Sequence, residues 1–259
     1  MRLPTGLSSL LAEANESDLR ELDSLTTELE HRYEVEKCLA GATVDGLYIP
    51  GPLYWLRFVM GDSGGGPGIE TFDEKWRDKG SAPYPRFPGP DTHPYLPWLF
   101  NLFVDHRRVF LPKSREMMAS WCGIGFAVWS CQFFEKTRAI VQTQKDDKVI
   151  DLIKGSEVPG YSRTLIERQP KWLQERFPLT KPMKDQTQNE IAWANGSVIQ
   201  GVPRGADQIR QYHPTLVLFD EAAHLDEFQA AYGSADLVAS KCFWMNSTPM
   251  RAIWQPNRF

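Results

Sequence analysis

The chain has 259 residues, of which 42% are hydrophobic and 12% aromatic, so it can bury one substantial core but not several full-sized domains. Its 29 Lys and Arg residues against 33 Asp and Glu give a net charge of −4, which argues against wholesale electrostatic coating of nucleic acid or of a membrane. No run of about 18 apolar residues occurs, and the first residues lack the pattern of a signal peptide. We therefore expect a soluble, intracellular protein with no membrane partner.

The first 60 residues predict a helical extension. Glu16 to Ala40 is charged, with leucines at positions 19, 22, 25 and 29 and with Ser17 as a candidate N-cap, which indicates an amphipathic helix. Residues 61–97 are rich in Gly and Pro and cannot hold a regular element, so we expect an arm that wraps the core.

Residues 98–259 predict the core, an α/β domain with a mostly parallel sheet flanked by helices. Short apolar β-prone runs alternate with longer helical stretches, which is typical of such a sheet. The predicted strands are Arg108–Leu111, Ala139–Gln142, Leu216–Phe219 and Cys242–Asn246. Residues 191–199 predict a hairpin around Asn195-Gly196. The four cysteines have no metal or redox spacing, and we expect reduced core thiols at Cys38, Cys122, Cys131 and Cys242.

Residues 107–121 have the layout of a phosphate-binding P-loop, with a short strand, a compact loop and a helix beginning near Ala119. The usual motif has a glycine and a lysine directly before its Ser or Thr. Here Ser120 supplies the hydroxyl, but Met118 replaces the glycine and Ala119 the lysine. Lys113 and Arg115, at the other end of the loop, offer cationic donors to the phosphates. They also fit ordinary solvated loop charges, and the segment alone favours neither interpretation.

Two further strands end in residues suited to the same chemistry. The apolar run from Thr215 is followed by Asp220 and Glu221, which fits a carboxylate that holds Mg²⁺ and a carboxylate that polarises the attacking water. The run from Cys242 is followed by Ser247 and Thr248, which are placed to sense the γ-phosphate. Taken singly, an ordinary strand end and a Ser-Thr-Pro turn explain the two segments equally well.

In this order the segments resemble the N-terminal packaging ATPase domain of the large terminase subunit of tailed bacteriophages, over roughly residues 70 to 250. Lys113–Ser120 resembles the deviant Walker A motif of that family, Leu218–Ala223 its Walker B motif and Ser247–Pro249 its coupling motif. Weaker similarity involves Thr71–Lys75, Gln142–Asp146, Asn195–Ser197 and Arg204-Gly205. The resemblance implies an ASCE-type P-loop NTPase fold.

The resemblance also implies an activity and site residues. It predicts an ATP hydrolase that uses Mg²⁺ with ATP to translocate double-stranded DNA into a procapsid, with Glu221 as catalytic carboxylate, Ser120 and Asp220 on Mg²⁺, and Ser247 and Thr248 as coupling residues. The phosphate-binding residues would be Lys113, Ser114, Arg115, Glu116, Met117, Met118, Ala119 and Ser120.

Two arginines are candidates for an arginine finger that acts on the adjacent subunit. Arg210 lies eleven residues before Glu221, where related terminases present such a finger, and Arg204 is the alternative. Either one also fits an ordinary surface arginine.

The chain departs from the family pattern in two places. The adenine-recognition glutamine is missing, and the corresponding region offers Tyr95, Pro97, Trp98 and Asn101. The C-terminal RNase H-like nuclease domain is expected to be absent from this chain, so we expect no nuclease activity from it. The implied partners are double-stranded DNA, the portal protein of the procapsid, the small terminase subunit and further copies of the chain in a ring, although the isolated chain fits a monomer. The implied location is the cytoplasm of the bacterial host, docked on the procapsid.

The segment from Tyr161 to Lys184 carries a local excess of four positive charges with interleaved aromatic residues. It fits contact with a phosphate backbone without reading of sequence, but the sequence alone favours a solvated helix whose aromatic side chains pack inward. The candidate DNA contacts are Arg163, Arg168, Lys171, Arg176, Lys181 and Lys184.

Two other functions remain open at this point. One is a helicase-like, nucleic-acid-dependent ATPase that is not tied to a capsid. The other is a catalytically decayed nucleotide-binding module, in which Ala119 marks the loss of the motif lysine.

Overall fold

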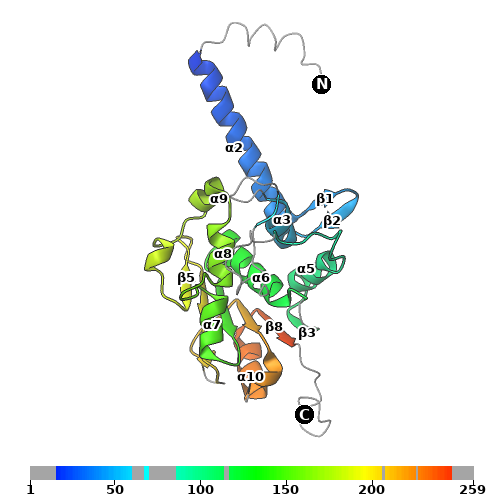
Figure 1. The fold of residues 1–259 in the computed structure, drawn as a ribbon, viewed down its shortest axis with the longest axis vertical. Coiled ribbons are helices and arrows are strands. Elements are labelled where there is room, and N and C mark those ends of the chain that lie inside the picture. Colours follow the sequence, from blue (N-terminus) through cyan, green and yellow to red (C-terminus); the bar gives the residue numbers. More distant parts are fainter. Residues whose placement is uncertain are drawn as a thin grey trace.

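The computed structural model describes residues 16–59, 67–69, 86–113, 117–205, 208–225 and 227–246. These residues form a body built around one central sheet, from which the first helix projects (Figure 1). Among the described helices, none is long and apolar enough to cross a membrane.

The central sheet has six strands in the order β3-β8-β7-β4-β6-β5. Every neighbouring pair is parallel except β5 and β6, which are antiparallel. The four strands predicted from apolar runs are all present, within one residue at each end. The strands are β3 (Arg108–Pro112), β4 (Arg138–Gln142), β5 (Glu190–Ala192), β6 (Val198–Gly201), β7 (Leu216–Phe219) and β8 (Lys241–Asn246).

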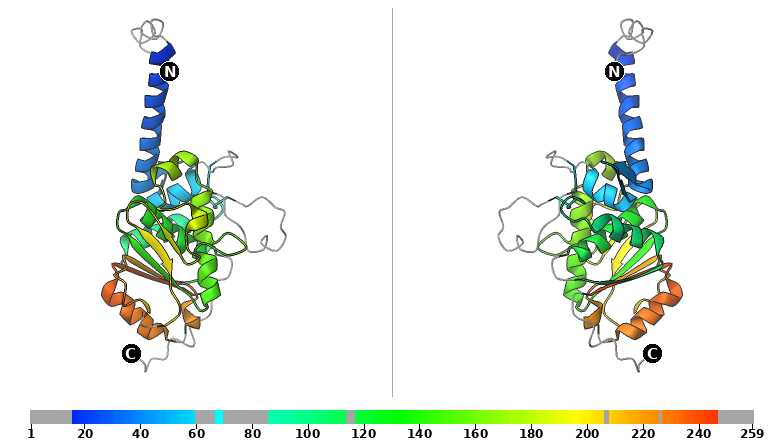
Figure 2. Two further views of the ribbon diagram at one scale, coloured as in Figure 1. Left: turned by 90° about the vertical axis from the view of Figure 1, so that its left-hand side faces the viewer. Right: turned by 90° about the vertical axis from the view of Figure 1, so that its right-hand side faces the viewer.

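The strands are apolar on both faces because helices cover both sides of the sheet. Successive side chains of a strand point to opposite faces, so Val217 and Phe219 pack with α10 (Phe228–Val238), while Leu216 and Leu218 pack on the other side. Burial on both faces is the usual situation of strands in a parallel sheet. Figure 2 shows α10 on one side of the sheet and the remaining helices on the other.

The larger layer of helices is organised around α6 (Ala119–Phe133), which begins where the sequence predicts and is buried on nearly all sides. Close packing on the sheet favours a glycine at position 123, because a Cβ there would lie within about 3 Å of the side-chain ends of Leu218 and Met245, which would have to shift. The other helices of the body are α3 (Gly51–Phe58), α5 (Leu96–Asp105), α7 (Asp146–Leu152), α8 (Tyr161–Glu167) and α9 (Lys171–Arg176).

The N-terminal region consists of α2 (Glu16–Ala40) and a hairpin of β1 (Ala42–Val44) and β2 (Leu47–Ile49), followed by α3. Helix α2 has the predicted bounds. Trp55 on α3 is fully buried in the main core, and its Nε1 donates to Oε1 of Gln169 at 3.3 Å. Ile69 and Phe87, from the Gly- and Pro-rich stretch, are also fully buried in that core.

The predicted hairpin is present between β5 and β6, but its turn is longer than a tight Asn-Gly turn. Ala192 pairs with Val198, so five residues form the connection. The longer turn is held from outside, since Asn195 Nδ2 donates to the Cys131 carbonyl at 3.0 Å and Ser197 Oγ donates to the Phe134 carbonyl at 2.6 Å.

The position of β8 confirms the predicted fold class. It lies between β3, which leads into the candidate P-loop, and β7, which ends at the two carboxylates. This is the strand order of an ASCE-type P-loop fold. The four cysteines are buried free thiols, as expected, and burial raises the pKa of the Cys122 and Cys131 thiols well above the ordinary range.

Candidate nucleotide site

The candidate site lies where β3 and β7 end, beside the first turn of α6. In an open parallel sheet, the loops at the carboxyl ends of the strands form the crevice in which ligands bind. The topology brings Lys113 after β3, Ser120 at the start of α6, and Asp220 and Glu221 after β7 to this edge. These residues come from positions about 100 apart in the chain.

Ser120 and Asp220 form a direct pair. Ser120 Oγ donates to Asp220 Oδ2 at 2.9 Å, and Oδ1 of the same carboxylate is buried without a hydrogen-bond partner. Burial raises the pKa of Asp220, against the opposing effects of the Lys113 charge and the Ser120 hydrogen bond. An orphaned carboxylate oxygen beside a hydroxyl suits Mg²⁺, which prefers oxygen ligands. Among the described residues, no cluster of three or more His, Cys, Asp or Glu could hold a metal, so phosphate and water oxygens would complete the shell.

Lys113 reaches Glu221 across the site. Its Nζ lies 3.0 Å from Glu221 Oε1, and the two side chains are 10% and 23% exposed. Ala119, at the position of the motif lysine, is buried. The cation at this site therefore comes from the front of the loop.

The backbone on both sides of the site adopts left-handed conformations. Met118, which replaces the motif glycine, has φ 50° and ψ 17° directly before α6, and Glu221 has φ 52° and ψ 46°. Glycine adopts this region freely, whereas other residues pay about 1 kcal/mol or more, and such strain clusters at functional sites. Met118 thus adopts a backbone conformation that glycine takes up more readily. Ser114, Arg115 and Glu116 lie outside the described residues.

The proposed adenine region lies at the start of α5. Tyr95 Oη donates to the Met117 carbonyl at 2.9 Å, and burial raises the Tyr95 pKa to about 12. Tyr95 therefore braces the loop. Pro97 is buried in the first turn of α5, Asn101 is half-buried, and Trp98 is 61% exposed. Trp98 has the only fully available aromatic face among these four residues.

The two finger candidates lie in the connection between β6 and β7. Arg210 is exposed, and its Nε donates to the hydroxyl of Ser234 on α10 at 2.9 Å. Arg204 is exposed between Pro203 and Gly205.

Sequence reasoning missed the role of Gln142 at the end of β4. Its backbone carbonyl accepts the Asp220 N–H at 3.0 Å, while its Nε2 donates to the carbonyls of Pro203 and Gly205 at 2.7 and 3.1 Å. The side chain is fully buried, and its Oε1 has no hydrogen-bond partner. Gln142 therefore links the carboxylate end of β7 to the turn that carries Arg204.

A cavity of about 270 Å³ lies next to this link. Its lining residues are Gln142, Arg204, Gly205, Leu225, Glu227 and Ala231. The sequence offered two weak signals for Gln142: it is a polar residue that closes the second apolar run, and it begins the segment Gln142–Asp146 that weakly resembles the terminase family.

The basic segment does not converge on this site. Arg163 pairs with Glu167 at 2.9 Å within α8, and Arg176 pairs with Glu28 of α2 at 3.1 Å. Arg168 is half-buried, and the other exposed positions besides Arg176 are Lys171, Lys181 and Lys184. The interleaved aromatic side chains pack inward or against neighbours, with Tyr161 stacked on Trp121 and Trp172 stacked on His31.

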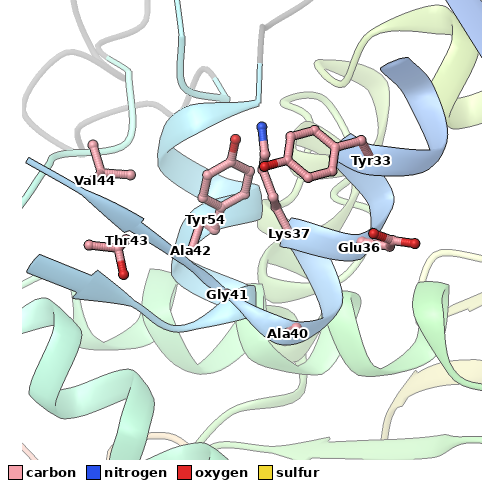
Figure 3. A pocket seen from close by; sticks show the side chains of 9 residues that line it. All are labelled: Tyr33, Glu36, Lys37, Ala40, Gly41, Ala42, Thr43, Val44 and Tyr54. Carbon is pink, nitrogen blue, oxygen red and sulfur yellow. The ribbon is translucent and has the colours of Figure 1, made fainter. Parts of the chain in front are cut away.

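The predicted coupling residues Ser247 and Thr248 follow β8 and lie outside the described residues. A cavity of about 470 Å³ lies at the base of α2, between that helix, the β1–β2 hairpin and Tyr54 of α3 (Figure 3).

The fold and this site together define a P-loop NTPase architecture. No model of a known protein family matches the sequence, and no curated protein matches it either. Solved structures do match. The large terminase of bacteriophage HK97 is 12% identical, with a TM-score of 0.46, over 64% of this chain and 34% of that protein.

The large terminase ATPase domain of Thermus phage P74-26 is similar to this chain as well. A mutant form is 16% identical, with a TM-score of 0.38, over 57% of this chain and 62% of that domain. Another structure of the domain is 14% identical, with a TM-score of 0.36, over 55% and 60%. The chain thus spans less than two thirds of each of these three structures. At these identities the function has to be argued from the chain's own site.

Proposed function

We propose that this chain is a Mg-ATP hydrolase that drives translocation of double-stranded DNA into a viral procapsid. The observation that carries the ATPase assignment is the pairing of Ser120 with Asp220 and of Lys113 with Glu221 across one sheet edge, at 2.9 and 3.0 Å. Strand ends, a helix N-terminus and a cation meet there as phosphoryl transfer requires.

The contacts suggest how each residue works. Ser120 and the spare oxygen of Asp220 would hold Mg²⁺, which supplies charge neutralisation to the phosphates when bound. Lys113 neutralises Glu221 while no phosphate is present. A bound phosphate competes for the ammonium group, which frees the Glu221 carboxylate to orient the attacking water and to accept its proton.

The connection between β6 and β7 fits an arginine supplied to a neighbouring subunit. Arg210 is exposed and held by Ser234, and Arg204 lies in a turn held by Gln142. We assign Gln142 as a positioning residue for this connection, with Arg210 or Arg204 acting in trans on transition-state charge. Such a site is complete only between subunits of an oligomer.

The DNA-packaging role rests on the order of motifs in the sequence, which resembles that of large terminases. It implies the portal protein, the small terminase subunit and a homo-oligomeric ring as partners, in the cytoplasm of the bacterial host. It also implies that Ser247 and Thr248 couple hydrolysis to movement.

The test of the ATPase is turnover of Mg-ATP at high protein concentration, where subunits meet. Glu221→Ala is expected to lower turnover by about 10²–10⁴-fold, the usual range for a lost general base, and to leave nucleotide binding by isothermal titration largely intact. Glu157→Ala, which changes an exposed glutamate between α7 and α8, is the matched control. Undiminished turnover in Glu221→Ala, or no turnover in the concentrated parent chain, contradicts the assignment.

A second assay separates packaging from helicase action. A packaging motor requires a portal-bearing procapsid for net DNA movement and does not separate strands. Strand separation by the isolated chain, without any capsid, would instead identify a helicase-like ATPase.

A further inference from the structure

Helix α2 contacts the body through one side only. Cys38 is fully buried, Val35 packs against the core, and His31 stacks on Trp172 with ring centroids 4.2 Å apart. These contacts involve the C-terminal half of the helix, and the N-terminal half extends away from the body (Figures 1 and 2).

The opposite side of α2 carries an exposed apolar track. Leu22, Leu25, Leu29 and Tyr33 are 49%, 56%, 64% and 61% exposed. At 3.6 residues per turn these four positions fall within roughly 80° of arc, on the far side of the helix from the residues that face the body. A contiguous exposed stripe of this kind marks an interaction site more often than a solvated surface.

The track leads into the cavity at the base of the helix. Tyr33, Glu36, Lys37 and Ala40 line that cavity from α2, together with the start of the hairpin and Tyr54. In Figure 3 the rings of Tyr33 and Tyr54 border the cavity, and the Lys37 ammonium group lies 4.2 Å from the Tyr33 ring centroid. From Leu22 to Ala40 the track is about 27 Å long, which is the length of a helix of about five turns.

The charges beside the track are acidic. Helix α2 carries eight Asp and Glu residues and three Lys and Arg residues. Glu16, Glu28 and Glu34 are in ion pairs with residues of this chain. Four other carboxylates have no ion-pair partner among the described residues: Glu21, Asp23, Glu30 and Glu36.

The exposed leucines and the unpaired carboxylates indicate what kind of partner would bind this face of α2. Leucines need an apolar partner surface, and unpaired carboxylates on both flanks need cations. Two α2 helices packed on each other would place like charges side by side. We infer that this face of α2 is the docking site for a helix of a different protein, whose apolar side chains are flanked by Lys or Arg and which packs along α2 as one helix on another.

The test uses the full 259-residue chain and two synthetic helical peptides as probes. Both peptides carry the same leucine stripe, one flanked by lysines and the other by glutamates. Fluorescence anisotropy is expected to show binding of the lysine-flanked peptide only, with weaker binding at higher salt. Leu25→Asp and Leu29→Asp are each expected to weaken this binding at least tenfold.

Ser24→Asp is the matched control, because it adds the same charge on the face of α2 that is turned away from the track. It is expected to bind the lysine-flanked peptide as the parent chain does. Since all three positions are exposed, circular dichroism should show unchanged folding.

Three outcomes overturn the inference. The first is no binding of the lysine-flanked peptide, and the second is equal binding to the parent chain and to Leu29→Asp. The third is a parent chain that self-associates in sedimentation velocity while Leu29→Asp is monomeric, which would make the track an interface between copies. None of these results bears on ATP turnover, so the docking site and the ATPase are tested independently.

Discussion

The carboxyl edge of the sheet and the basic segment of residues 161–184 differ in how sequence maps onto space. At the sheet edge, Lys113 and Ser120 are about 100 residues from Asp220 and Glu221 in sequence, yet Lys113 lies within hydrogen-bond distance of Glu221 and Ser120 within hydrogen-bond distance of Asp220. In the basic segment, six cations are close in sequence, but Arg163 pairs within α8, Arg176 pairs with Glu28 of α2, and the exposed lysines are spread over α9 and the connection after it.

The difference teaches that strand topology concentrates chemistry more effectively than local composition does. Parallel strands deliver their C-terminal residues to one edge wherever they occur in the chain. Charges that follow one another on short helices point in different directions around those helices, and some of them form ion pairs with nearby carboxylates.

The largest effect is expected from a change at Asp220, which is the most buried residue of the sheet-edge cluster. Asp220→Asn should abolish ATP turnover and the rise in melting temperature produced by Mg-ATP, because the variant weakens the magnesium site and with it the ligand-linked stabilisation. Thermal shift with and without Mg-ATP measures this. Asp236→Asn, which removes the partner of Arg108, is the control and should keep the Mg-ATP shift. A full shift in Asp220→Asn would remove Asp220 from the site.

The next largest effect is expected from Arg210, which is proposed to act on the sheet-edge cluster of a neighbouring subunit. Arg210→Ala should reduce turnover by about 10³-fold, the lower end of the value of an arginine finger. Mixing Arg210→Ala subunits with Glu221→Ala subunits should restore part of the activity, because each supplies what the other lacks. If only Arg204→Ala shows both the loss and the rescue, Arg204 is the finger.

Gln142→Leu should have a smaller effect, roughly 10–100-fold on turnover, because it misplaces an arginine rather than removing it. The readout that identifies a positioning role is again mixing with Glu221→Ala subunits. Rescue in the mixture would mean that the carboxylates of the Gln142→Leu variant still function and that the defect lies in its connection between β6 and β7, which carries the arginine. A loss without rescue would mean that Gln142 supports only its own Asp220.

The smallest effects are expected from changes in the basic segment of residues 161–184. If the exposed cations touch DNA, Lys181→Ala with Lys184→Ala should lower the slope of log affinity against log salt by about two, since each phosphate contact contributes about 0.9. Arg176→Ala should leave the slope unchanged and cost at most about 1 kcal/mol of unfolding free energy, because it loses an exposed pair with Glu28. An unchanged slope in the double variant argues that DNA contacts lie elsewhere.

Much of the fold was predictable because it depends on local patterns. Apolar β-prone runs identified β3, β4, β7 and β8, and the residues that follow β3 and β7 indicated the site. The bounds of α2 were predictable for the same reason. Its periodicity did not reveal which face meets the body, because His31, Val35 and Cys38 make those contacts while the leucines face solvent.

The rest depends on contacts between distant segments. Gln142 is a single polar residue at a strand end, and its partners are the carbonyls of Pro203 and Gly205, about sixty residues away. The bracing of the loop by Tyr95 through the Met117 carbonyl is equally invisible in the sequence. Backbone carbonyls carry no side-chain signature, so hydrogen bonds to them cannot be inferred from composition or spacing.

The left-handed conformation of Glu221 implies a trade between stability and activity. A non-glycine residue at φ 52° stores about 1 kcal/mol that the folded chain must supply. Glu221→Gly releases this strain and also removes the partner of Lys113, so the variant should be inactive yet unfold at a temperature no lower than that of Glu221→Ala. Under the proposed function, the strained backbone of Glu221 is stability that the chain gives up for chemistry.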